Sequence, residues 1–214
     1  MKKLLSVFFF LFCGICYSQV TAVTEQGDSV YLWDDGTWQF VHADSSEADS
    51  ASYDETFTID TNSTQYTKSS NALKALKGQK VKYELWYDAD KWSQANINRD
   101  DAEYYLKNDE NEAFCLVLPE RLTTTTYGLL DAAYQKANSA GGVDSVSYEM
   151  RKVNNNYVAM MKMYVKINDI HFLFMGYYYT GEERTIQVIT FTTINLVDEY
   201  IKDMEELLNG FVVP

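Results

Sequence analysis

The stretch that decides the fold is IHFLFMGYYYT, residues 170–180, because it reads as one extended strand with two apolar faces. Alternation along a strand assigns one face to Ile170, Phe172, Phe174 and Tyr178. It assigns the other face to His171, Leu173, Met175, Tyr177 and Tyr179. A strand that is apolar on both faces needs cover on both sides of its sheet. We therefore expect Phe172, Leu173, Phe174 and Met175 all to be shielded from water.

Three further strands are predicted around this one, at 143–153, 157–167 and 184–193. The connections between the four strands are short and rich in Asn, Asp and Gly, so neighbouring strands should run antiparallel. One amphipathic helix precedes the four strands and another follows them. The sequence thus predicts an α+β protein, a three-layer α/β/α sandwich around a mainly antiparallel sheet.

The first helix is predicted over 126–140, with a stop at Gly141 and Gly142. Its apolar face holds Leu129, Leu130, Ala133, Tyr134 and Ala137. The second helix is predicted to begin at Asn195 as N-cap and to end at Gly210. Its apolar stripe holds Val197, Tyr200, Ile201, Met204, Leu207, Leu208 and Phe211.

Upstream of the first helix the pattern is weaker. Residues 81–87 are predicted to form a strand, followed by a turn at 88–91 and by Trp92. A second strand is predicted over 113–118 and should end at Pro119, which lacks a backbone N–H. The polar stretch 99–112 between them allows no assignment.

The chain begins with a basic pair, Lys2 and Lys3, and a short apolar run that ends in Cys16-Tyr17-Ser18. This pattern predicts a secretory signal peptide over 1–18, cleaved after Ser18. Cleavage would remove two of the three cysteines and make the formal charge of −13 two units more negative. The remaining Cys115 lies in an apolar run and should be a buried thiol. So acidic a surface argues against nucleic acid and disfavours adsorption on anionic lipid.

Residues 19–43 are predicted to form an aromatic β-hairpin, because Asp35-Gly36 suits a two-residue type I′ turn. That turn pairs Tyr31 with Phe40 and Trp33 with Trp38, and so predicts one face that carries Tyr31, Trp33, Trp38 and Phe40. These aromatic residues are candidates for binding a protein or a glycan partner. The alternative is that they pack on the main domain, since an isolated hairpin is marginally stable.

Residues 44–60 carry six acidic residues and no basic one, which predicts a flexible linker. The main domain is expected over 61–214. Asp88 and Asp90 are weak candidates for calcium ligands, since their turn lacks the other ligands of a calcium loop. His171 is expected to be a core or edge residue, because zinc normally needs three or four protein ligands. The sequence contains no phosphate loop, zinc-protease motif or nucleophile elbow, and no cofactor is expected.

Several segments resemble PsbP-like domains: YELWY at 83–87 followed by Trp92, the run 170–181, TFTT at 190–193, and ELLNGF at 206–211. The resemblance covers about 65–213. It implies a binding or adaptor role, because the family includes a photosystem subunit, a nuclear-import factor and bacterial adaptors that share no catalytic residues. Separately, 30–40 resembles an Asp-Asp-Gly-Thr-Trp motif of exported Bacteroidetes proteins, which implies the periplasm or exterior of a Gram-negative cell.

Three functions remain open at this stage. The first is an exported, non-catalytic binding module whose partner is a protein or a glycan. The second is an envelope enzyme with a site built from carboxylates such as Glu84, Asp88 and Asp90. The third is a carrier that holds a small apolar ligand between a helix and the sheet. No span of the membrane is expected after the signal is removed.

Overall fold

The computed structural model describes residues 20–23, 29–32, 38–40, 59–96 and 101–214. The chain divides into two units, residues 1–55 and 56–214, and each is described by itself. The predicted signal peptide and nearly all of the predicted linker lie outside the described residues. The boundaries proposed for them therefore stay predictions, although Asp60, which we placed in the linker, begins a strand of the second unit.

In the first unit, three short strands pair antiparallel in the order β1-β2-β3. They are β1 (Val20–Val23), β2 (Ser29–Leu32) and β3 (Trp38–Phe40). The pairing of β2 with β3 sets Leu32 opposite Trp38 and Val30 opposite Phe40. Our predicted pairing of Tyr31 with Phe40 is therefore wrong by one residue, and the predicted turn at Asp35-Gly36 lies outside the described residues.

The second unit is built on an eight-stranded sheet in the order β4-β10-β11-β12-β13-β9-β8-β7. All its neighbouring strands are antiparallel except β4 and β10, which run parallel. Its strands are β4 (Asp60–Tyr66), β7 (Trp92–Gln94), β8 (Tyr104–Asn108), β9 (Ala113–Glu120), β10 (Val143–Val153), β11 (Asn156–Ile167), β12 (Ile170–Gly181) and β13 (Arg184–Thr193).

The four central strands β10 to β13 confirm the predicted antiparallel run. Two of their turns are made by pairs of residues that both adopt positive φ, Asn154-Asn155 and Asn168-Asp169. A two-residue turn with positive φ at both positions matches the right-handed twist of the flanking strands. Asn and Asp tolerate this conformation better than other non-glycine residues, which is why these short connections are rich in them.

The strand predicted to end at Pro119 continues to Glu120 in β9, so that prediction is wrong. The carbonyl of Val117 accepts a hydrogen bond from the backbone N–H of Glu103, just before β8. Backbone groups of alternate residues point to the same side of a strand, so the nitrogen of Pro119, like the carbonyl of Val117, faces β8. At Pro119, however, β8 has already ended, because its last pair with β9 is Tyr104 with Val117. A missing N–H therefore disrupts no ladder bond there.

A second, three-stranded sheet has the order β14-β6-β5, with β5 (Lys74–Lys77), β6 (Glu84–Tyr87) and β14 (Phe211–Val212). The strand predicted at 81–87 thus begins later and lies outside the main sheet. Phe211, which we assigned to the last helix, instead pairs with Leu85 as part of β14. Both side chains are fully buried, so the small sheet packs its inner face on the core.

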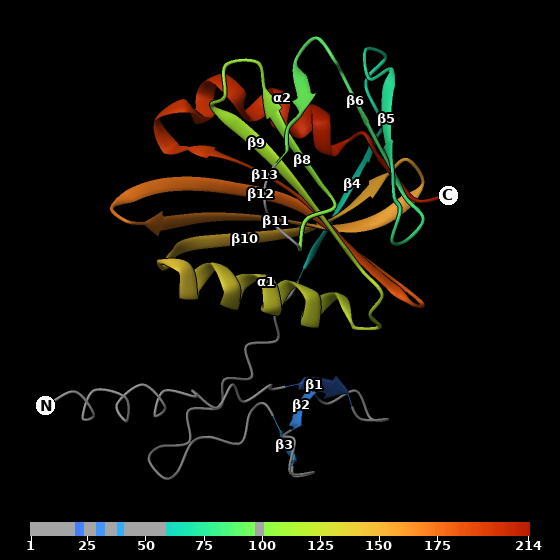
Figure 1. The fold of residues 1–214 in the computed structure, drawn as a ribbon, viewed down its shortest axis with the longest axis vertical. Helices are drawn as coiled ribbons and strands as arrows, with labels where there is room; N and C mark the ends of the chain where they lie inside the picture. Colours follow the sequence, from blue (N-terminus) through green and yellow to red (C-terminus); the bar gives the residue numbers. More distant parts are fainter. Residues whose placement is uncertain (1–19, 24–28, 33–37, 41–58, 97–100) are drawn as a thin grey trace, which may run out of the picture. The chain divides into compact units, whose positions relative to one another are not determined.

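Two helices cover the main sheet, α1 (Thr126–Ala140) and α2 (Val197–Leu208), and Figure 1 shows them on opposite sides of it. The bounds of α1 and its apolar face are confirmed, and Thr125 caps it through a hydrogen bond from Gly128 N to Thr125 Oγ1. The predicted N-cap of the second helix is wrong. Asn195 lies within a 3-10 turn, η1 (Ile194–Leu196), and no side chain caps α2.

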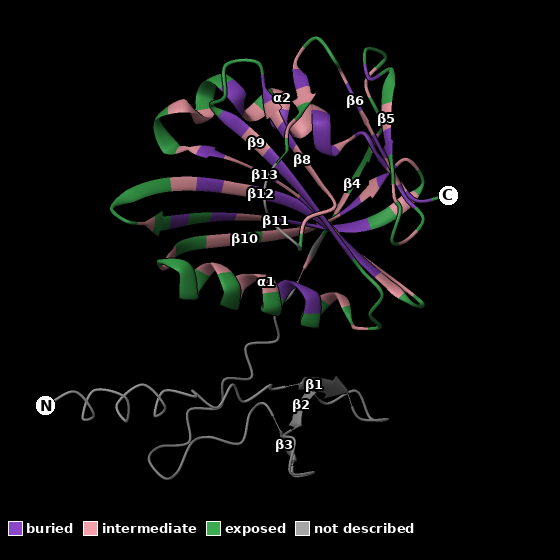
Figure 2. Ribbon diagram, in the orientation of Figure 1, coloured by how far each residue is buried: buried purple, intermediate pink, exposed green. Residues whose placement is uncertain are grey.

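The core has two parts, one on each face of the sheet (Figure 2). Alternate residues of β11 show the division, because Met160 packs in the cluster under α2 and Met161 in the cluster under α1. Among the described residues, no helix has the length and apolar character needed to cross a membrane.

Candidate binding surface

The four aromatic residues of the predicted hairpin face cannot be assembled from the observed register. Trp33 lies outside the described residues. Tyr31 is opposite Gln39, whereas Trp38 is opposite Leu32 and Phe40 opposite Val30. The prediction that the four aromatic residues share one face required Tyr31 to pair with Phe40. The observed register does not contain that pair. A binding role for these residues stays a prediction.

Asp88 and Asp90 form a tight turn. Asp88 Oδ1 accepts a hydrogen bond from Asp90 N at 2.9 Å, and the carbonyl of Asp88 accepts one from Trp92 N at 2.9 Å. Glu84 is engaged elsewhere, since it accepts from Trp86 Nε1 at 2.9 Å. In the part of the chain that the structure describes, no three His, Cys, Asp or Glu residues gather as metal ligands would.

His171 lies at the exposed end of β12, where its Nδ1 is 3.0 Å from Asp144 Oδ2. Both side chains are about half exposed. The structure thus places His171 at the surface beside a carboxylate, on the central strand β12, so neither the core nor the sheet-edge position that we expected is observed.

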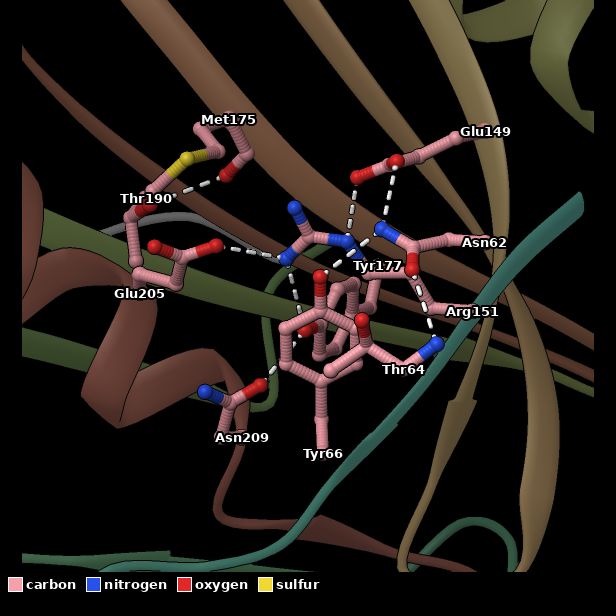
Figure 3. Close-up of polar contacts among 10 residues, drawn as sticks. All are labelled: Asn62, Thr64, Tyr66, Glu149, Arg151, Met175, Tyr177, Thr190, Glu205 and Asn209. Atoms are coloured by element: carbon pink, nitrogen blue, oxygen red, sulfur yellow. Dashed lines mark hydrogen bonds and ion pairs between the residues drawn. The ribbon is translucent and has the colours of Figure 1, made fainter. Parts of the chain in front are cut away.

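A buried arginine that sequence reasoning missed organises the polar contacts under α2 (Figure 3). Arg151 on β10 is only 5% exposed. Its Nε donates to Glu149 Oε1 at 2.5 Å and its Nη1 donates to Glu205 Oε1 on α2 at 2.7 Å. Its guanidinium also lies over the ring of Tyr66 on β4, at 4.4 Å from the centroid. One cation thereby joins a sheet edge to a helix.

Neighbouring side chains complete this arginine cluster. Asn62 on β4 donates to Glu149 Oε2 at 3.0 Å and to Tyr66 Oη at 2.9 Å. Tyr177 accepts from Arg151 Nη1 at 3.2 Å and donates to Asn209 Oδ1 at 2.6 Å. The signal in the sequence was the spacing of Glu149 and Arg151, two residues apart on one strand and so on one face.

Ion pairing and burial shift the pKa values of the groups in the arginine cluster. Burial by itself would raise the pKa of Glu149, but the hydrogen bonds from Asn62 and Arg151 outweigh it and hold that pKa below its ordinary value. Burial raises the pKa of Tyr177 to about 12, so its hydroxyl stays protonated. Glu149 and Glu205 are both ion-paired with Arg151. Neither carboxylate of this cluster is therefore free to act as an acid or a base.

A row of stacked aromatic rings crosses the other face of the sheet. We call it the aromatic strip; it consists of Tyr105, Phe114, Phe191, Phe174 and Phe172. Its ring centroids are 5.8 Å apart for Tyr105 and Phe114, 5.3 Å for Phe114 and Phe191, and 5.3 Å for Phe174 and Phe191. Phe172 follows at 6.1 Å from Phe174. The strip thus spans β8, β9, β13 and β12, which are neighbours in the sheet.

All five rings of the aromatic strip are only partly buried. The helix α1 packs on β10, β11 and β12, so Tyr105, Phe114 and Phe191 lie on strands beyond its edge (Figures 1 and 2). Phe174 on β12 packs against the core cluster under α1 and is still only partly buried. On the opposite face, Leu173 and Met175 are fully buried. We expected Phe172 and Phe174 to be shielded from water as well, and the structure shows both only partly buried.

An ion pair lies at the border between α1 and the strip. Lys136 Nζ on α1 is 3.2 Å from Asp101 Oδ2, in the segment that leads into β8. Both side chains are exposed, so the pair contributes little to stability, but it places this segment beside α1.

The structure also bears on the apolar-ligand hypothesis. A cavity between the small sheet and α2, lined by Ser69, Tyr87, Lys91, Trp92, Glu206 and Leu207 among others, has a volume of about 10 Å³. This volume suits one water molecule at most. A drug-sized ligand would need several hundred Å³ or so.

No model of a known protein family matches the chain, and no curated protein matches it. Solved structures do. PsbP (CyanoP) of the cyanobacterium Synechocystis sp. PCC 6803 aligns with a TM-score of 0.50 at 14% identity, over 67% of this chain and 94% of that one. The second unit has a PsbP-like fold. This confirms the resemblance noted in residues 65–213.

Two further structures align less well. LpqN of Mycobacterium tuberculosis, described as involved in cell envelope biogenesis, gives a TM-score of 0.48 at 9% identity, over 66% of this chain and 90% of that one. A protein of Bacteroides thetaiotaomicron VPI-5482 gives 0.42 at 10% identity, over 62% of this chain and 45% of that one.

Proposed function

We propose that this chain is an exported, non-catalytic binding module that docks a partner protein on its aromatic strip. The observation that carries the proposal is the half-buried state of five neighbouring aromatic rings on one sheet face, four of them stacked. Contiguous apolar surface that stays open to water is typical of interaction sites. Aromatic residues are also enriched among those that dominate binding energy in protein interfaces.

Ring geometry supports a protein rather than a glycan on this surface. A sugar stacks on the open face of an aromatic ring, but here the faces are turned toward neighbouring rings, with interplanar angles of 13°, 28° and 23° along the strip. The five side chains stay partly exposed as a row of apolar surface. Such a surface suits an apolar face of another protein, as α1 covers the adjacent half of the sheet.

The PsbP-like fold supports the same reading in general terms, because the resemblance implies binding rather than catalysis. We infer that the second unit has the three layers of an α/β/α sandwich, and the two core clusters beneath α1 and α2 support this. The signal-like first 18 residues support export to the periplasm or exterior of a Gram-negative cell. The partner would then be met in the envelope.

Site-specific photo-crosslinking in the cells that produce the protein tests this function. A photoreactive phenylalanine at position 172 should give one discrete adduct that mass spectrometry identifies. The matched control is position 157 on β11, where Tyr157 is 62% exposed but lies outside the strip. The proposal predicts an adduct at 172 and none at 157. No adduct at 172, or the same adduct from both positions, would overturn it.

A further inference from the structure

A second surface differs in charge from the rest of the molecule. Residues 61–83 contain five lysines and no acidic residue, in a chain with 31 acidic residues and a net charge of −13. We call Lys68, Lys74, Lys77, Lys80 and Lys82 the basic patch. All five side chains are exposed. They lie on β5, the edge strand of the small sheet, and on the turns before and after it, which Figure 2 shows largely in the colour of exposed residues.

The charges of the basic patch are mostly unneutralised. Lys77 is 3.8 Å from Glu84, and Lys68 lies over the ring of Trp86 at 4.8 Å from its centroid. Lys74, Lys80 and Lys82 form no ion pair with any residue that the structure describes. Arg121 adds a sixth cation, because its Nε donates to the carbonyl of Lys80 at 3.1 Å.

Glu84 and Glu103 lie at the basic patch, and hydrogen bonds hold each of them there. Glu84 accepts from Trp86 Nε1 at 2.9 Å. Glu103 accepts from the backbone N–H groups of Gln79 and Lys80 at 2.6 and 2.9 Å, and from Tyr83 Oη at 2.7 Å. These hydrogen bonds fix the conformation of the turn after β5, so the lysines on this turn extend from an ordered backbone.

An apolar side chain projects among these lysines. Leu73, directly before β5, is 77% exposed, the largest exposed fraction among the large apolar side chains of the described residues. Trp86 lies partly exposed on β6, opposite Ala75 of β5. By strand alternation Lys77 shares the outward face of β5 with Ala75, opposite Trp86, whereas exposed Lys74 shares the other face with buried Leu76. Lysines, a tryptophan and an exposed leucine gathered around one edge strand are a combination found where proteins rest on the surface of a bilayer.

We propose that this face docks on an anionic lipid surface, with Leu73 entering the interfacial layer and the basic patch contacting the head groups. Charge complementarity selects lipid of negative charge, and the exposed Leu73 selects a bilayer over a soluble acidic chain. The net negative charge of the protein does not prevent this, because charges more than about 8 Å from the lipid are screened at physiological salt. Our expectation that the acidic protein would not adsorb on anionic lipid rested on net charge alone, and it overlooked this locally basic surface.

The test uses the full mature chain and vesicles of phosphatidylcholine with or without phosphatidylglycerol, in a sedimentation assay. The chain should bind vesicles that contain phosphatidylglycerol, and added salt should weaken the binding. Lys74→Glu with Lys80→Glu should weaken it by at least about tenfold, because each lysine near such a surface contributes about fivefold. Leu73→Ser should weaken it severalfold with no change of charge.

The control makes the same charge change elsewhere, at two exposed lysines, as Lys166→Glu with Lys202→Glu. It should leave binding within about twofold of the wild type, since these residues lie outside the basic patch. Absence of binding to the anionic vesicles, or equal losses in both double variants, would overturn the proposal. It would also be overturned if Leu73→Ser bound normally while soluble polyglutamate competed fully, because the ligand would then be an acidic protein.

Discussion

Arg151 Nη1 on β10 lies 2.7 Å from Glu205 Oε1 on α2, so one buried cation holds the second helix against the edge of the sheet. The same guanidinium holds Glu149 and lies over Tyr66 of β4, the strand that follows the predicted linker. Through this contact the beginning and the end of the PsbP-like unit are joined at one residue.

Replacing this arginine should be strongly destabilising. Arg151→Met removes the cation and leaves Glu149 and Glu205 without their partner, which should lower the free energy of unfolding by about 3 kcal/mol. The measurement is urea unfolding followed by tryptophan fluorescence. Arg121→Met removes an exposed arginine and should change stability by less than about 0.5 kcal/mol. A similar small effect for both variants would show that the arginine cluster does not hold the fold together.

The stability of the unit should fall at acidic pH. Hydrogen bonds from Lys91 and then from Ser69 lower the pKa of Glu206 below its ordinary value of 4.5, and the contacts with Asn62 and Arg151 lower that of Glu149. A carboxyl group whose pKa is lowered by folding stabilises the protein above its unfolded pKa. That contribution is lost as pH falls through the lowered value, so the urea midpoint should decrease below about pH 5.

The variant Glu206→Gln isolates one of these contributions. The wild type should be more stable than the variant at neutral pH, and the difference should shrink as the pH is lowered. Glu182→Gln, at an exposed turn, should give a curve parallel to the wild type. A difference between wild type and Glu206→Gln that did not depend on pH would mean that the Lys91–Glu206 pair, 2.7 Å apart, has no ionic role.

The thiol of Cys115 should be unreactive in the folded protein. It is fully buried on β9, and burial raises its pKa well above the ordinary value. In a chain that starts at residue 19 it is the remaining cysteine, so labelling reports on it alone. A thiol reagent should modify it only in denaturant, where the rate should match that of a small thiol. Rapid labelling under native conditions would contradict the core position of this strand.

The aromatic residues of the first unit make a separate prediction. Trp33→Ala with Trp38→Ala should abolish capture of a partner if these residues bind one, and should leave the melting temperature of the second unit unchanged. Scanning calorimetry and affinity capture on the same samples measure both. A large fall in that melting temperature would instead show that the segment packs on the main domain and stabilises it.

The elements that the sequence predicted best are those with a long periodic pattern. The apolar face of α1 and the alternating side chains of β10 to β13 can be recognised from the residues of each segment alone. Turns rich in Asn and Asp mark the ends of the strands. Strands β4, β5, β7, β8 and β14 were missed because they are short or polar, and the partners of β4 and β14 also lie far along the chain. Phe211 shows the limit clearly, since its spacing fits the helix but its contact with Leu85 lies in the small sheet.

The two candidate surfaces were hidden for different reasons. The aromatic strip depends on the order of strands, because Phe114 meets Phe191 only when β9 lies beside β13. Nothing local to either strand reveals that order. The basic patch was visible as a run without acidic residues, but the overall charge of the chain obscured it. Exposure of Leu73 beside these lysines is a tertiary property that required the structure.

The most direct test of the account is the affinity of the purified chain for the partner that crosslinking at position 172 identifies. Phe191→Ala and Phe172→Ala should each raise Kd by at least about tenfold, or about 1.4 kcal/mol, because they remove apolar surface from the centre and one end of the strip. Tyr157→Ala, outside the strip, should leave Kd unchanged, and circular dichroism should show all three variants folded. Equal affinities for the strip variants and the wild type would contradict the account.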